Sequence, residues 1–82
     1  MADSPLFEKA CDELEQATHL SQTEARGTLR IALKEAGYEA GSVNRPQLLA
    51  VVFHSLPQEL AARGLRDAQK LCDMIASRLA TA

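Results

Sequence analysis

Apolar residues recur along most of the chain at the three- and four-residue spacing of helices, and residues 48–56 are the densest run. The predicted inner stripe of this run consists of Leu48, Leu49, Val52, Phe53 and Leu56. Ala50 and Val51 fall outside the stripe, so the helix is apolar over most of its circumference. Such a helix is usually covered on several sides. We therefore expect it to be the hub helix of the fold.

Three further helices are predicted, at residues 5–18, 21–36 and 65–79. The expected buried stripe of the first consists of Phe7, Ala10, Cys11, Leu14, Ala17 and Thr18. That of the second consists of Ala25, Leu29, Ala32, Leu33 and Ala36. That of the last consists of Leu65, Ala68, Leu71, Cys72, Ile75 and Leu79. The acids of the first helix fall mostly on its opposite face, which is expected to be exposed: Glu8, Asp12, Glu13 and Glu15. Gly27 lies inside the second helix and indicates a close crossing with a neighbouring helix.

Capping residues mark the helix ends. Ser4-Pro5 predicts an N-cap followed by proline in the first turn. The segments Ser21–Glu24 and Asn44–Gln47 have the spacing of a capping box, in which the first and fourth residues bond each other's backbone N–H groups. Gly37 is expected to end the second helix because glycine readily adopts positive φ.

Pro57 must disturb the hub helix, because proline disfavours helical geometry in the residue before it. Either the helix kinks there, or it stops near His54 and restarts with Ser55 as a new N-cap. We favour the restart, which predicts a short helix to about Arg63, ended by Gly64.

These patterns predict an all-α fold: a compact four-helix domain with short loops, whose third helix is broken or kinked near Pro57. We expect residues 1–82 to form a single domain. Residues 1–3 and 81–82 are expected to fray.

Composition narrows the class of function. The chain is 46% hydrophobic and 24% charged, with a formal net charge of −2. This balance is ordinary for a globular domain and lacks the basic excess of most nucleic-acid-binding proteins, so a nucleic-acid partner is not expected. No signal peptide or membrane-spanning run is apparent, and two separate cysteines do not form a disulfide framework. We therefore expect a cytoplasmic protein without a membrane partner.

The sequence offers little catalytic or metal-binding chemistry. Cys11 and Cys72 lie in apolar stripes and are expected to be core residues. The cysteines and histidines are too scattered for a zinc site, and residues 37–47 hold too few acids for calcium. No serine or cysteine is placed with a histidine as a nucleophile and its base. We expect neither an enzyme nor a cofactor.

One serine has a specific precedent. The segment Glu39-Ala40-Gly41-Ser42-Val43, followed by the apolar hub helix, resembles the stretch of acyl and peptidyl carrier proteins in which a serine carries phosphopantetheine. The resemblance implies a four-helix carrier domain modified on Ser42. Residues 21–36, however, are predicted as a helix where carriers have a long loop.

A basic edge on the second helix is the main candidate for binding. Arg26, Arg30 and Lys34 recur every four residues and so share one face, and Tyr38 follows in a loop where it is expected to be exposed. We interpret the chain as a small non-enzymatic interaction, adaptor or regulatory module that contacts another protein, or a second copy of itself, through this surface. The alternatives are the carrier domain and a nucleic-acid-associated regulator using the same edge.

Overall fold

The computed structural model describes residues 4–81, which contain helices and no strands. Five helices follow one another: α1 (Pro5–Ala17), α2 (Gln22–Ala36), α3 (Arg45–His54), α4 (Leu56–Ala62) and α5 (Ala68–Ala80). The all-α prediction is confirmed, but the number of helices is five rather than four. The expected fraying of residues 1–3 and 82 lies outside the described residues, whereas Thr81 donates a hydrogen bond from Oγ1 to the Arg78 carbonyl, 3.1 Å away.

The first two helices begin where their capping residues predict. Ser4 accepts a hydrogen bond from the Phe7 N–H at 3.1 Å. Both bonds of the Ser21–Glu24 capping box are present. Gly37 ends α2 with φ of 86°, in the left-handed region where a side chain would be strained. These contacts satisfy backbone groups that a helix leaves without internal partners at its ends.

The hub helix breaks before Pro57, as predicted. α3 begins with the Asn44–Gln47 capping box and ends at His54. Ser55 still donates its N–H to the Val51 carbonyl, but Pro57 has no N–H with which to continue the ladder. The prediction that Ser55 caps the next helix is wrong, because its backbone is helical and its side chain makes no capping bond. α4 therefore follows α3 almost directly.

The last helix begins three residues later than predicted. Gly64 has φ of 80°, and the Leu65 N–H bonds back to the Leu60 carbonyl at 3.1 Å, closing the end of α4. Asp67 is also left-handed, with φ of 56°. The two left-handed residues turn the chain, so Leu65 and the residues up to Asp67 cannot form the first turn of α5.

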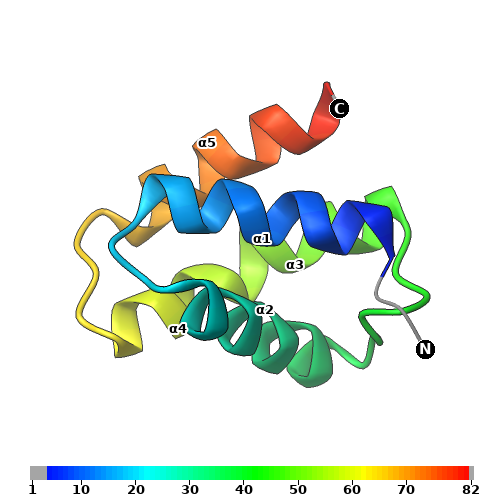
Figure 1. Cartoon of the computed structure of the whole chain (residues 1–82), viewed down its shortest axis with the longest axis horizontal. Helices are drawn as coiled ribbons and strands as arrows, with labels where there is room; N and C mark the ends of the chain where they lie inside the picture. The colour runs from blue at the N-terminus through cyan, green and yellow to red at the C-terminus, as the bar shows by residue number, and fades with distance from the viewer. Residues whose placement is uncertain (1–3, 82) are drawn as a thin grey trace.

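α3 is the hub of the packed molecule. It contacts each of the other four helices. In Figure 1, α1 crosses the front with α5 above it, α2 and α4 lie below, and α3 runs behind α1. The chain is also tied at its beginning, because the Ser4 N–H donates to the Ala40 carbonyl in the loop before α3, at 3.0 Å.

The core is aliphatic apart from one phenylalanine. Its largest fully buried apolar side chains are Phe7, Leu14, Leu29, Leu33, Leu48, Val51, Val52, Leu56, Leu60, Ile75 and Leu79. Cys11 and Cys72 are buried among them, as predicted. The stripes differ from the prediction at their margins: Ala36 is exposed, and Ala17, Thr18, Leu65, Ala68 and Leu71 are only half-buried.

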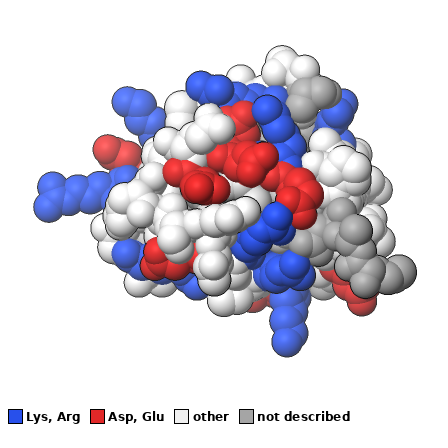
Figure 2. Space-filling model, in the orientation of Figure 1, with Lys and Arg blue, Asp and Glu red and all other residues white. Residues whose placement is uncertain are grey.

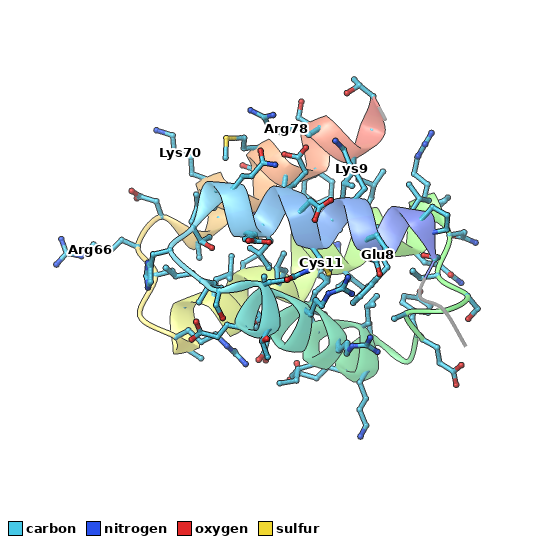
Figure 3. The ribbon with its side chains drawn as sticks, viewed as in Figure 1. Glu8, Lys9, Cys11, Arg66, Lys70 and Arg78 are labelled. Atoms are coloured by element: carbon cyan, nitrogen blue, oxygen red, sulfur yellow. The ribbon has the colours of Figure 1, made fainter. Side chains whose placement is uncertain are left out.

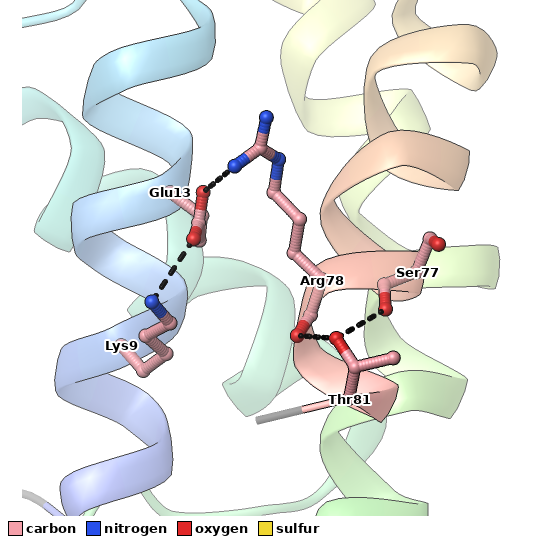
Figure 4. A network of polar contacts seen from close by, with 5 residues as sticks. All are labelled: Lys9, Glu13, Ser77, Arg78 and Thr81. Carbon is pink, nitrogen blue, oxygen red and sulfur yellow. Dashed lines mark hydrogen bonds and ion pairs between the residues drawn. The ribbon is translucent and has the colours of Figure 1, made fainter.

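Glu13 was predicted on the exposed face of the first helix, and this is wrong. The residue is only 6% exposed, because α5 packs beside it. Glu13 Oε2 lies 3.1 Å from Lys9 Nζ, and Oε1 lies 3.6 Å from an Arg78 guanidinium nitrogen (Figure 4). A carboxylate can be buried here because two cations from two helices neutralise it.

Gly27 does not mark a helix crossing. A methyl group placed on its Cα would meet no other atom within 4 Å, so no neighbouring helix requires glycine there. Across the described residues, no helix combines the length and apolar character needed to cross a membrane.

Candidate functional site

The basic edge of α2 is largely engaged in holding α1. The Arg26 guanidinium forms a two-pronged contact with the Glu8 carboxylate, in which Nη1 donates to Oε1 at 3.0 Å. This hydrogen bond holds the pKa of Glu8 below its ordinary value. The Arg30 guanidinium carbon lies 5.2 Å from the centre of the buried Phe7 ring, within cation–π range. Two of the three predicted cations therefore join α2 to α1.

The other two residues of the predicted surface differ from each other. Lys34 is exposed in the last turn of α2. Tyr38 lies in a loop as predicted, but it is half-buried against the core rather than exposed. Its N–H donates to the Leu33 carbonyl at 2.9 Å. Tyr38 is therefore part of the packing that follows α2, and only part of its ring is available to a partner.

On the face that Figure 2 shows, acidic and basic side chains lie next to each other, and no single basic patch covers it. Figure 2 shows Asp and Glu side chains gathered over α1, with Lys and Arg on both sides. Figure 3 shows Glu8 directed toward α2, while Lys9 and Arg78 lie on the α5 side of α1. In the same view Arg66 extends outward from the α4–α5 connection. This mixed surface gives little support to a phosphate backbone as the partner.

Two acids meet where α2 packs on α4. A hydrogen bond between the Glu35 and Glu59 carboxyl groups raises the pKa of Glu35, because the bond requires one of them to hold a proton. Glu59 also lies 3.0 Å from an Arg63 guanidinium nitrogen. This pair is an electrostatic feature of the helix interface, and no third metal-ligating residue joins it. Nowhere in residues 4–81 do three or more His, Cys, Asp or Glu side chains gather as metal ligands.

Ser42 lies on an exposed turn before α3. Its N–H donates to the Glu39 carbonyl at 3.2 Å, and the next residue, Val43, is buried. Ser42 itself is exposed. Ser42 precedes the N-cap Asn44 by two residues, and α2 fills the region where carrier proteins have a long loop.

An apolar surface that the sequence prediction missed lies on the outer face of α3. Phe53, predicted to be buried, is 44% exposed. It continues a stripe that is exposed or half-buried along the whole helix: Pro46, Leu49, Ala50 and Phe53. The inward stripe consists instead of Leu48, Val51 and Val52. We call Pro46, Leu49, Ala50 and Phe53 the outer α3 stripe.

The spacing of the outer α3 stripe is itself a helical signal, because its residues recur at i, i+3, i+4 and i+7. The hub helix therefore carries two apolar stripes on opposite faces. Successive residues of a helix are separated by about 100° around its axis. On this scale, the face of α3 that points inward is centred nearer to Val51 than the predicted face was. Sequence alone could have identified both stripes, but not which one the other helices cover.

Comparisons of the chain with protein-family models, with curated protein sequences and with solved structures find no match. The site must therefore be interpreted from its own geometry. On that geometry, the outer α3 stripe is an uncharged apolar ridge on a short helix, and the basic edge of α2 is a set of contacts within the molecule.

Proposed function

We propose that this protein is a non-enzymatic cytoplasmic interaction module whose contact surface is the outer α3 stripe. The observation that carries the proposal is the exposure of Phe53, 44%, at the end of a helix that is otherwise the hub of the core. Exposing a large aromatic ring to water costs free energy that a partner would recover by covering it. Aromatic side chains are also frequent anchors of protein interfaces.

The partner that fits this stripe best is a second copy of the chain. The positions 46, 49, 50 and 53 are symmetric about the midpoint between Leu49 and Ala50. Two α3 helices that cross there about a twofold axis place Phe53 of each copy against Pro46 of the other. Leu49 then lies beside the smaller Ala50. The stripe contains no charged residue, so the twofold axis brings no like charges together.

Such an interface is small, so the dimer should be weak. Stable interfaces commonly bury on the order of 1,200 Å² or more in total, which a single ten-residue helix does not provide. We therefore expect association in the micromolar range or weaker, visible only when concentration is varied over several decades.

Sedimentation equilibrium over this concentration range tests the proposal. The wild-type chain should change from monomer to dimer, and Phe53→Ser should remain monomeric with its helical content unchanged. The matched control is Ile31→Ser, because Ile31 has a similar exposure, 42%, but lies on α2. Ile31→Ser should associate like the wild type. A wild-type chain that stays monomeric throughout, or a Phe53→Ser chain that still dimerises, would contradict self-association through α3.

The carrier domain is a second candidate, and the exposure of Ser42 is the observation that favours it. Incubation with a broad-specificity phosphopantetheinyl transferase and coenzyme A should then add one phosphopantetheine mass to the wild type and none to Ser42→Ala. Absence of a mass gain, or a gain that survives Ser42→Ala, removes this candidate. The pairing of Arg26 with Glu8 gives no support to the nucleic-acid alternative.

A further inference from the structure

A groove between α1 and α5 lies apart from both the outer α3 stripe and the basic edge of α2. Its volume is about 260 Å³. Six residues line it: Glu13, Gln16 and Ala17 from α1, and Met74, Ile75 and Arg78 from α5. The groove is thus built on two packed helices, which hold its walls in fixed positions.

Its charged groups carry one excess positive charge, because two cations share one carboxylate. Glu13 is nearly buried and lies 3.1 Å from Lys9, an ordinary ion-pair distance. Arg78 is 3.6 Å from the same carboxylate, beyond the range of a good hydrogen bond, and its side chain is 57% exposed. Lys9 and Arg78 therefore share the single negative charge of Glu13 (Figure 4), and the more exposed guanidinium of Arg78 can receive a further anion at the groove.

Apolar side chains complete the groove beside that guanidinium. Met74 is 40% exposed, which is unusual for a large apolar residue in this structure. Ile75 is buried beneath it, and Ala17 is half-buried on the facing helix. The groove therefore combines one cation with an adjacent apolar wall, and a ligand that uses both must be amphipathic.

We propose that this groove binds a small monocarboxylate with an apolar body. The carboxylate pairs with Arg78, and the hydrocarbon part covers Met74 and Ala17. An amine is disfavoured because it would compete with Lys9 and Arg78 for the single carboxylate of Glu13. A second negative charge is disfavoured as well, because Glu13 lines the groove and further acids lie along α1.

The size of the groove limits the ligand. A volume of about 260 Å³ lies below the roughly 300–1,000 Å³ of pockets that hold drug-sized molecules. The apolar body is therefore a short chain or a single ring. This inference does not depend on self-association, because Phe53 does not line the groove.

The two methionines of the chain provide a direct test. With ¹³C-methyl methionine, the protein gives one signal from Met74 in the groove and one from Met1, which serves as the internal reference. Hexanoate is the probe, and hexylamine and hexanol are the matched cationic and neutral controls. Hexanoate should shift the Met74 signal saturably, and both controls should bind at least about tenfold more weakly, as loss of a charge-assisted hydrogen bond implies.

A pair of variants separates Arg78 from general charge. Arg78→Gln should weaken hexanoate binding by about tenfold or more. This substitution removes the same charge-assisted hydrogen bond that the controls lack, but it does so by changing the protein instead of the ligand. Arg66→Gln removes an arginine that points away from the body and should bind like the wild type. The proposal is overturned if hexanoate gives no saturable shift, if hexanol or hexylamine binds equally well, or if Arg78→Gln binds hexanoate like the wild type.

Discussion

Glu8 and Glu35 are surface carboxylates whose pKa values move in opposite directions. Arg26 bonds the ionised form of Glu8 and lowers its pKa. Glu59 bonds the protonated form of Glu35 and raises its pKa. Because a shift between folded and unfolded states makes stability depend on pH, the two acids should affect the unfolding free energy with opposite signs.

Glutamine substitutions should reveal these signs. Near pH 7, Glu8→Gln should lower the free energy of unfolding, and this loss should vanish as the pH falls through the lowered pKa of Glu8. Near pH 7, Glu35→Gln should raise the free energy of unfolding, because the amide mimics the protonated acid. That gain should vanish below about pH 4, where Glu35 is protonated in both states. Urea titrations from pH 3 to pH 7 measure the free energy of unfolding of each variant. If both substitutions changed it in the same direction near pH 7, the opposite pKa shifts of Glu8 and Glu35 would be contradicted.

Gly27 should be a position for stabilisation. Alanine there would meet no atom within 4 Å and would remove the helix-weakening effect of glycine, so Gly27→Ala should stabilise the fold by about 1 kcal/mol. Gly37→Ala is the control with the opposite sign, because φ of 86° strains a residue that has a Cβ, and it should cost about 1 kcal/mol. Thermal unfolding of the two variants beside the wild type would show the difference. A destabilised Gly27→Ala would mean that the space is occupied.

Individual residues were predictable where their neighbours in sequence decide their environment. Ser4 and the two capping boxes act locally, and their roles are confirmed. Glu13 was predicted wrongly because its burial depends on Lys9 and on Arg78, which is 65 positions away and arrives with α5. The left-handed backbone of Asp67 was not predicted: Asp adopts this region more readily than most residues, but the turn between α4 and α5 is what requires it at this position.

At the scale of the element, two serines that both precede a helix should behave differently. Ser21 accepts the Glu24 N–H at 3.2 Å, whereas Ser55 makes no side-chain capping bond. Ser21→Ala should therefore cost about 1 kcal/mol of stability. Ser55→Ala should change stability by less than about 0.5 kcal/mol. The midpoint of urea unfolding, at an unchanged denaturant slope, measures the stability of each variant. Equal losses of stability in the two variants would contradict the different capping roles of Ser21 and Ser55.

The helices were predictable as elements because their periodicity and their end signals agree. The interruption before Pro57 follows from the missing N–H of proline, which no tertiary contact can restore. The direction that α3 faces could not be obtained in this way. With apolar residues all round, only the positions of the other helices decide that Phe53 faces outward and Val51 inward. The candidate interaction surface was missed for this physical reason.

For the whole molecule, the two thiols report whether the core is closed. Cys11 and Cys72 are 3% and 0% exposed, and burial raises the pKa of Cys72 to about 12. Neither thiol should react with Ellman's reagent at pH 8 in the native protein, and both should react in denaturing urea. The reaction rate at intermediate urea should follow the unfolding curve. A thiol that reacts at the native baseline at the rate of a free cysteine would show that its helix opens locally.

The basic edge shows why a surface is harder to predict than a core. Arg26, Arg30 and Lys34 do share one side of α2, as the four-residue spacing requires. Their availability, however, depends on how α1 crosses α2, and that crossing places Glu8 and Phe7 against the first two. Sequence spacing predicts which side chains lie on the same face of a helix. It does not predict which of them contact a neighbouring helix.

The packing of α5 on α1 also has a consequence for synthesis of the protein. α1 leaves the ribosome long before α5, and the buried residues of α5, Cys72 to Leu79, complete the core around Phe7 and Leu14. At roughly 5–20 residues per second, the intervening fifty or so residues take several seconds to appear. During that interval α2 and α3 can pack on α1, but the part of α1 that α5 covers has no final partner. The core around Phe7 and Leu14 can therefore be completed only after α5 has been synthesised.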